Sequence, residues 1–368
     1  MNDQRLTNWQ AMCILISTIA GVGVLPLPRL AVTAGESAAP LVTVGGILLG
    51  ALLVMLWSLL GMRFPDLSPV AYSKLILGKW ASGVLLFVIA LFYLVATAFS
   101  FREFSEVTGT FVLRRTPLEV ILFMMLLLVV ISARKDIYSF TLIHAFYTPF
   151  VIGPVVFMMI LSFSEVELLN LRPFTTNPDF TFWVGSLGIT TLFRNVVIYT
   201  FIVPRMRNPQ KALKVGLTGT AISGGLYLVI VITTVGVFGT EEIKRLVWPT
   251  LELGRATIVP GEFLERMDAL FLVTWIISVF NSLLSGYYLI LLIIKEKLGL
   301  KDHRMLATFL MPFMFLAAMM PQNVIQLYRL STHILPWGLI AMIIIPSALL
   351  VVAGIRGKGG VAHAPDKG

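Results

Sequence analysis

The sequence contains only one cysteine, Cys13, in a chain of 368 residues. A single thiol cannot form a disulfide within the chain, and it cannot build a Cys-based zinc site or a CxxC redox site. The HExxH, Walker, GxSxG and dinucleotide-binding patterns are also missing from the sequence. We therefore expect a protein that is not an enzyme and that carries neither a metal nor a cofactor.

Charged residues are also scarce. The 28 Lys and Arg and the 19 Asp and Glu residues make up 13% of the chain, whereas about 25% is usual in soluble proteins. Hydrophobic residues make up 57%, and the mean hydropathy is +0.90. A water-soluble core could not hide this much apolar surface, so the composition indicates an integral membrane protein surrounded by lipid.

Ten long apolar stretches are candidates to cross the membrane, since a helix of about 20 residues spans the hydrocarbon layer. They predict an all-α membrane protein with a single transmembrane domain over residues 1–356 and a disordered cytoplasmic tail over 357–368. The predicted spans are 9–34, 41–62, 80–104, 118–133, 138–163, 182–203, 215–238, 269–294, 305–320 and 334–355.

The basic residues of the loops predict the orientation, because Lys and Arg are retained on the cytoplasmic side. With the N-terminus inside, 17 of the 28 basic residues fall in cytoplasmic segments and 8 fall outside. Both termini are therefore expected in the cytoplasm. The same asymmetry explains the net charge of +9, so a nucleic-acid partner is not expected.

The longest extracytoplasmic loop is predicted at residues 239–266. It mixes charged residues with apolar ones, which predicts a short helix lying at the membrane interface. The sequence leaves open whether this loop is a lid over a binding site or a docking surface for a partner.

The two halves of the predicted bundle share irregularities at matching positions. Spans 118–133 and 305–320 are the shortest of their halves, and spans 138–163 and 334–355 each contain two prolines. The first and sixth spans are both interrupted, at Gly21, Gly23, Pro26 and Pro28 in one and at Gly185 and Gly188 in the other. These matches predict a 5+5 inverted repeat in which helices 1 and 6 are broken.

The polar backbone groups at the break of a membrane helix predict which ligand binds there. Backbone N–H groups lose their partners at the break, so an N-terminal helix end attracts a carboxylate, while free carbonyl groups attract an ammonium. An amino acid in its zwitterionic form fits this pattern. The alternative is that glycine and proline only kink the helix for close packing.

Several short motifs resemble one known family. The stretch at 21–29 reads GVGVLPLPR, residues 63–66 read RFPD, and residues 77–79 read LGK. Residues 248–250 read WPT, and residues 258–270 read IVPGEFLERMDAL. Together these motifs resemble the endospore germination permeases, which are the B subunits of germinant receptors, over nearly the whole chain.

The resemblance implies a fold and a role. The germination permeases resemble the amino acid, polyamine and organocation transporters, which implies a fold of ten helices in an inverted repeat. It also implies a receptor subunit that senses a nutrient, usually an amino acid, in the spore inner membrane beside A and C subunits. Val22 stands where many transporters of this superfamily have a serine.

The candidate ligand-binding residues come from the predicted breaks and from polar residues at mid-membrane depth. Tyr93 and Thr97 lie one turn apart on one helix face, as do Ser278, Asn281 and Ser285. Such side chains can orient a ligand or bond to neighbouring helices, and both uses stay open. The predicted ligand-binding set is Gly21, Val22, Gly23, Val24, Tyr93, Thr97, Leu187, Gly188, Thr190, Phe280 and Asn281.

Charged residues inside spans need partners, because an unpaired charge at the bilayer centre is costly. Arg102 and Glu106, at i and i+4, predict a structural ion pair, with Glu103 pointing elsewhere. Arg194 is predicted to be a structural charge beneath the pocket that does not contact the ligand. No acidic residue is expected near the two breaks.

Three functions remain open from the sequence. The first is a receptor subunit whose ligand shifts a conformational equilibrium. The second is a proton- or sodium-coupled amino acid transporter, for which His144 is the candidate proton carrier, although a single buried histidine is more often structural. The third is a subunit of an ion-conducting assembly, which needs more polar pore-lining faces than the sequence contains.

Overall fold

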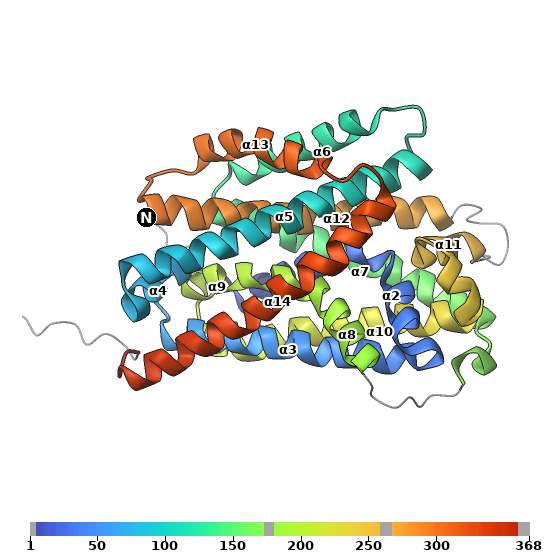
Figure 1. The fold of residues 1–368 in the computed structure, drawn as a ribbon, viewed down its shortest axis with the longest axis horizontal. Coiled ribbons are helices and arrows are strands. Elements are labelled where there is room, and N and C mark those ends of the chain that lie inside the picture. Colours follow the sequence, from blue (N-terminus) through green and yellow to red (C-terminus); the bar gives the residue numbers. More distant parts are fainter. Residues whose placement is uncertain (1–4, 173–179, 258–266, 360–368) are drawn as a thin grey trace, which may run out of the picture.

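The computed structural model describes residues 5–172, 180–257 and 267–359, and these residues form a bundle of helices (Figure 1). The α-helices are α1 (Asn8–Ile19), α2 (Leu27–Gly35), α3 (Ala39–Arg63), α4 (Pro69–Leu77), α5 (Lys79–Phe111), α6 (Leu118–Ala133), α7 (Ile137–Ser162), α8 (Phe180–Thr190), α9 (Ile198–Ile202), α10 (Ala212–Arg245), α11 (Pro249–Ala256), α12 (Met267–Leu298), α13 (Arg304–Met319) and α14 (Val324–Ile355).

Seven helical stretches of the described residues are long and apolar enough to cross a membrane, which supports an all-α membrane protein. The shorter helices α6 and α13 are apolar too, but their 16 residues each give only about 24 Å of length. The stretch 9–34, predicted as one span, consists of two short helices, and the turn η2 (Glu36–Ala38), in which Glu36 has a φ of +48°, separates the second of them from α3. The count of ten spans and the inverted repeat therefore stay predictions.

The first interruption is where glycine and proline predict it. α1 ends at Ile19, and a short 3₁₀ turn, η1 (Val22–Val24), precedes the start of α2 at Leu27. Gly21 adopts an extended conformation before this turn, and Pro26 precedes the first residue of α2. Proline favours the first turn of a helix because it has no N–H to donate.

The second interruption differs from the prediction. Gly185 and Gly188 lie inside the regular helix α8, and the chain narrows to a 3₁₀ segment, η5 (Thr191–Val197), only after them. Gly185 has a packing role instead, because a Cβ atom there would lie 2.1 Å from the Cβ atom of Ala34. A lone glycine is tolerated in a helix when it allows such close contact.

The helices pack so that the interrupted segments lie inside the bundle. α12 is the most deeply buried span, and it packs against α1, α5 and α7. α3 packs against α8 and α10 on the other side, and α14 crosses the bundle diagonally (Figure 1). The ends of the described chain lie near α4 and α9, whereas α11 lies at the opposite end of the bundle (Figure 1).

Candidate functional site

The carbonyl groups at the end of α1 accept hydrogen bonds from neighbouring helices. Tyr227 of α10 donates its hydroxyl to the Ile19 carbonyl at 2.6 Å, and Ser278 of α12 donates to the Ala20 carbonyl. Both donors are buried. Carbonyl groups that the interruption removes from the helical ladder are therefore satisfied by side chains from two other helices.

The beginning of α2 is held by α11 in the same way. The Thr250 hydroxyl donates to the Val24 carbonyl at 2.8 Å, and the Thr250 backbone N–H donates to the Leu25 carbonyl at 3.4 Å. Thr250 is fully buried. The Trp-Pro-Thr motif thus joins the loop after α10 to the interruption between α1 and α2.

Replacing Thr250 by valine should lower the free energy of unfolding by about 1–3 kcal/mol, because the Val24 carbonyl loses its side-chain donor while the shape is kept. The unfolding midpoint in mixed SDS micelles measures this change. Thr218→Val is the matched control, since the Thr218 hydroxyl is exposed and bonds only within its own helix to the Lys214 carbonyl. Equal midpoints for the two variants would contradict the assigned role of Thr250.

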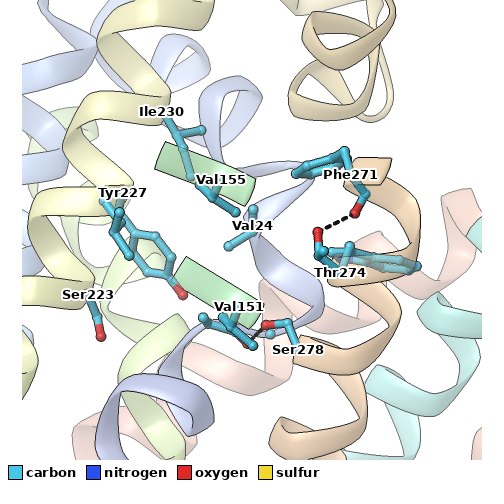
Figure 2. A pocket seen from close by; sticks show the side chains of 13 residues that line it. Val24, Val151, Val155, Ser223, Tyr227, Ile230, Phe271, Thr274 and Ser278 are labelled. Carbon is cyan, nitrogen blue, oxygen red and sulfur yellow. Dashed lines mark hydrogen bonds between the residues drawn. The ribbon is translucent and has the colours of Figure 1, made fainter. Parts of the chain in front are cut away.

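Two cavities flank the interruption, and the smaller one faces α7, α10 and α12 (Figure 2). This small cavity has a volume of about 30 Å³. Two buried polar atoms on its wall, Ser223 Oγ and Trp275 Nε1, have no protein partner. The space is large enough for one or two water molecules but too small for an amino acid.

The larger cavity lies on the other face of the interruption, between η1, α5, η5 and α14. Its volume is about 100 Å³. We call it the charged cavity, because Glu103 and Arg194 line it together with Gly23, Pro26, Leu30, Ala96, Phe99, Ser100, Gly188, Thr191, Leu192, Tyr328, Ser331, Thr332, Leu335 and Pro336.

The charged cavity continues into a wider space of about 470 Å³, which we call the vestibule. The two spaces share six wall residues: Pro26, Leu30, Gly188, Tyr328, Thr332 and Pro336. The rest of the vestibule wall is mostly apolar and includes Ala34, Val184, Val247, Val324 and Ile325, with Arg29, Thr33, Thr181 and Gly185. A small ligand could reach the interruption by this route.

Arg194 lies in the wall of the charged cavity, whereas the sequence predicted a position beneath the pocket. Its Nη1 atom donates to the Thr191 carbonyl at 3.0 Å, and its Nη2 atom donates to the Ser100 hydroxyl at 2.7 Å. Its Nε atom is buried without a partner. Tyr93 donates its hydroxyl to the Arg194 carbonyl and so fixes the backbone of η5.

Glu103 also lines this cavity, so the expectation that no acid lies near the breaks is wrong. The prediction failed because α5 runs on to Phe111, well beyond the expected end at residue 104, and Glu103 is therefore not at a helix end. Its Oε1 atom accepts a hydrogen bond of 2.8 Å from the Tyr328 hydroxyl. Tyr328 in turn accepts one of 2.8 Å from Trp248 Nε1.

The structure does not bring the predicted ligand-binding residues together in one place. Gly23 and Gly188 line the charged cavity, whereas Gly21 and Val24 line the small cavity. Thr97 lies against Gly286, where an added Cβ atom would be 2.4 Å from its hydroxyl.

The other predicted residues lie away from the charged cavity's wall. Thr190 bonds to the Gly46 carbonyl of α3 at 3.1 Å and so joins two helices. Phe280 makes an edge contact with Tyr147, and Asn281 is fully buried, with both amide atoms unpaired. Val22 is buried and Leu187 is partly buried in the apolar core.

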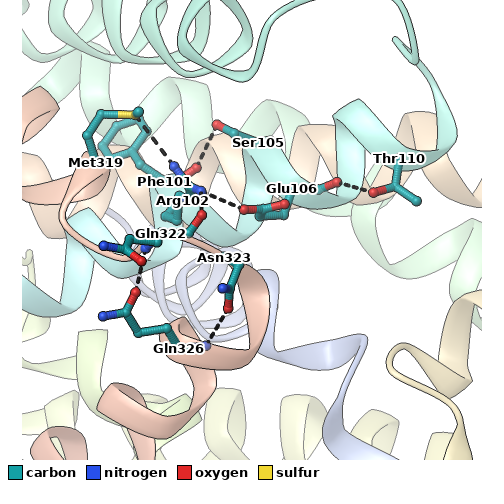
Figure 3. A network of polar contacts seen from close by, with 9 residues as sticks. All are labelled: Phe101, Arg102, Ser105, Glu106, Thr110, Met319, Gln322, Asn323 and Gln326. Carbon is teal, nitrogen blue, oxygen red and sulfur yellow. Dashed lines mark hydrogen bonds and ion pairs between the residues drawn. The ribbon is translucent and has the colours of Figure 1, made fainter.

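The predicted pair of Arg102 and Glu106 forms part of a polar network between α5 and the segment before α14 (Figure 3). Arg102 Nη2 lies 2.8 Å from Glu106 Oε1 and donates to the Gln322 carbonyl at 3.1 Å. Only 7% of the Arg102 side chain is exposed. Both residues lie outside the walls of the two cavities, so the geometry favours a structural role.

A double-mutant cycle with Arg102→Met and Glu106→Gln should give a coupling energy of about 0.5–3 kcal/mol, because the pair is shielded from water. Unfolding midpoints of the wild type, the single variants and the double variant measure it. The pair Lys244 and Glu241, also 2.8 Å apart, is the control, because it is exposed and should show no measurable coupling. Additive effects at Arg102 and Glu106 would refute the pairing.

His144 joins three helices within a cluster of hydroxyl groups. Its Nδ1 atom lies 2.6 Å from Ser17 Oγ, and its Nε2 atom lies 3.2 Å from Ser285 Oγ, which is 2.5 Å from Thr18 Oγ1. All four side chains are fully buried. Within the described residues, no group of three or more His, Cys, Asp or Glu side chains is placed to hold a metal ion.

A membrane bundle with an interrupted helix beside a cavity is the architecture of secondary transporters, and solved transporters share this fold. A Na⁺-coupled sialic acid symporter aligns with 96% of this chain and 76% of its own, with a TM-score of 0.63 and 13% identity. The nucleobase-cation-symport-1 family transporter MHP1 aligns over 96% and 94%, with a TM-score of 0.59 and 11% identity. At these identities the likeness concerns the fold alone.

Within this fold class, the chain belongs to the spore permease family of spore germination proteins, whose sequence profile matches residues 5–327. It is 27% identical to spore germination protein B2 of Bacillus subtilis (strain 168), with 98% of each chain covered. It is 25% identical to YndE of the same organism, over 96% of this chain and 98% of that one. It is 24% identical to GerLB of Bacillus cereus, over 99% and 98%. The resemblance seen in the motifs is confirmed.

Proposed function

We propose that this germination permease is a receptor subunit that binds a free amino acid in the charged cavity and signals to partner A and C subunits. Its place is the spore inner membrane, with both termini in the cytoplasm. The observation that carries the proposal is the charged cavity, which places polar groups from α5 and η5 against the interruption after α1.

The interruption supplies the flexible element that a receptor needs. In this proposal the ligand carboxylate lies against the turn Val22–Val24, where Gly21 and Gly23 let the backbone open. Thr250 connects the same segment to α11, so a change at the turn reaches the surface at the end of the bundle opposite the termini. A ligand that binds one arrangement more tightly shifts the population toward it.

The second candidate is a coupled amino acid transporter, which the fold shared with the two transporters favours. Transport against a gradient needs a driving ion with a site of its own. The hydroxyl cluster around His144 is the candidate proton site for this reading, because neutral imidazole can accept a proton. The receptor and the transporter differ in whether the bound ligand is released on the other side of the membrane.

Spores that lack this chain test the proposed function. They should lose germination with one group of amino acids, keep it with nutrients sensed by other receptors, and regain the lost response when the gene is restored. A tagged copy purified from spore membranes should bring down A and C subunits. An unchanged response to every amino acid, together with purification of the tagged chain alone, would contradict the proposal.

A further inference from the structure

Glu103 and Arg194 are opposite charges in one cavity wall, yet they do not pair with each other. Among the described residues, no ion pair within 4.0 Å joins them, and each is held by uncharged groups instead. Unpaired charges in a membrane protein are costly and usually mark a functional site. A ligand that carried both charges would satisfy both residues at once.

We infer that Glu103 binds the ammonium group and Arg194 binds the carboxylate of an α-amino acid, whose apolar side chain extends into the vestibule. This inference rests on the proposed function and adds the class of ligand and the residues that recognise it.

The two charges are close enough for one small molecule to reach both. Arg194 Nη2 bonds to the hydroxyl of Ser100, and Glu103 follows Ser100 by three residues in α5. Residues at i and i+3 of a helix lie on the same face, with Cβ atoms about 5–6 Å apart. The guanidinium and the carboxylate therefore face the cavity one helical turn apart.

Both residues keep hydrogen-bonding capacity for a ligand. A carboxylate offers about four acceptor positions, and the bond from Tyr328 to Glu103 uses one of them. A guanidinium has five N–H donors, and two of them are used by Thr191 and Ser100. Nη1 and Nη2 each make one of these bonds, so each keeps one N–H for a ligand carboxylate.

Gly23 completes the carboxylate end of the site. It borders the same cavity as Arg194, so the backbone of the turn forms part of the cavity wall. The carboxylate is thus placed between the guanidinium and the turn Val22–Val24. The backbone N–H groups of the turn and the guanidinium both attract the carboxylate, because each donates hydrogen bonds to an anion.

The remaining wall predicts the ligand side chain. A volume of about 100 Å³ accommodates several water molecules, which is enough for the charged half of an amino acid. The wall residues that the two spaces share connect the charged cavity to the vestibule, where Leu30, Val184 and Ile325 are apolar. An apolar side chain gains free energy by lying there, whereas a charged one loses hydration.

The test compares each amino acid with analogues that lack one charge. Purified full-length protein in nanodiscs is titrated with L-valine, L-leucine, L-isoleucine and L-phenylalanine. The tightest binder is then compared with its des-amino acid and with its decarboxylated amine. In the wild type each analogue should bind at least about 100-fold more weakly, because a buried charge on the protein is left unpaired.

Two variants assign each end of the ligand. In Glu103→Gln, the preference for the amino acid over its des-amino acid should fall from about 100-fold to below about tenfold, whereas its preference over the decarboxylated amine should stay. In Arg194→Gln, the preference over the amine should fall and the preference over the des-amino acid should stay. The exposed residues Glu119 and Arg115 provide the controls Glu119→Gln and Arg115→Gln, which should keep both preferences.

The outcomes separate the two hypotheses. If a free amino acid binds the wild type but an analogue binds equally well, the inference fails while the proposed function stands. This comparison uses the wild type alone, so it does not depend on the folding of a variant. If both variants keep both preferences, the charges are structural and the inference also fails. If no amino acid binds the wild type in the presence or absence of A and C subunits, the proposed function fails first.

Discussion

Spores carrying Gly23→Leu should not germinate with the amino acids that the wild type senses, although the protein remains in the membrane. A Cβ atom at Gly23 would lie 2.1 Å from Cδ2 of Leu192, which lines the charged cavity. Leu192 must therefore move, and the added side chain fills a space of only about 100 Å³. We expect at least a 100-fold loss of sensitivity, measured as the amino acid concentration that gives half-maximal germination.

The control for this substitution is Gly225→Ala. Gly225 lies on an exposed face of α10, and a Cβ atom there would meet nothing within 4 Å. Spores with this variant should germinate like the wild type, and immunoblots of spore membranes should show both proteins at normal levels. Normal sensitivity in Gly23→Leu spores would remove the ligand from this side of the interruption.

The first interruption could be predicted from sequence because its cause is local. Glycine and proline act on the backbone of their own segment, so Gly21, Gly23 and Pro26 predict where α1 must end. The second interruption has no such local cause. Gly185 resembles a helix breaker in the sequence, but its absent side chain allows α8 to approach Ala34, a residue about 150 positions away.

The acidic end of the site could not be predicted for a similar reason. The charge of Glu103 is plain in the sequence, but its depth depends on where α5 ends, and apolar content alone placed that end too early. Its hydrogen-bond partner Tyr328 lies 225 residues away on α14. Long-range partners of this kind depend on how helices pack, which hydropathy does not encode.

The role of the loop after α10 also becomes clearer. The sequence left a lid and a docking surface open, and residues 258–266 lie outside the described part of the chain. The described part begins with helix, since α10 continues to Arg245 through a kink at Gly239, whose φ is +70°. Trp248 bonds to Tyr328, which bonds to Glu103, so this loop is linked to the charged cavity by two hydrogen bonds.

Liposomes that contain only this chain should bind the amino acid without accumulating it. In the proposed receptor, the bond from Tyr328 to Glu103 and the bond from Trp248 to Tyr328 connect the ligand to α11. A 100-fold difference in affinity between two conformations shifts their equilibrium by about 2.7 kcal/mol. This free energy is enough to change the population of a signalling state, and no flux of ligand is required.

The measurement compares binding and uptake of the radiolabelled amino acid with and without a proton or sodium gradient. Saturable binding that gradients do not convert into accumulation fits a receptor subunit.

His144→Gln serves as the internal control for the proton-coupled transporter, because it removes the only described candidate proton carrier in the hydroxyl cluster of α1, α7 and α12. Accumulation above the external concentration that a proton gradient drives, and that His144→Gln abolishes, would establish a proton-coupled transporter and overturn the prediction. A sodium-driven accumulation would overturn it equally, because it would show that a sodium gradient carries the ligand across the membrane.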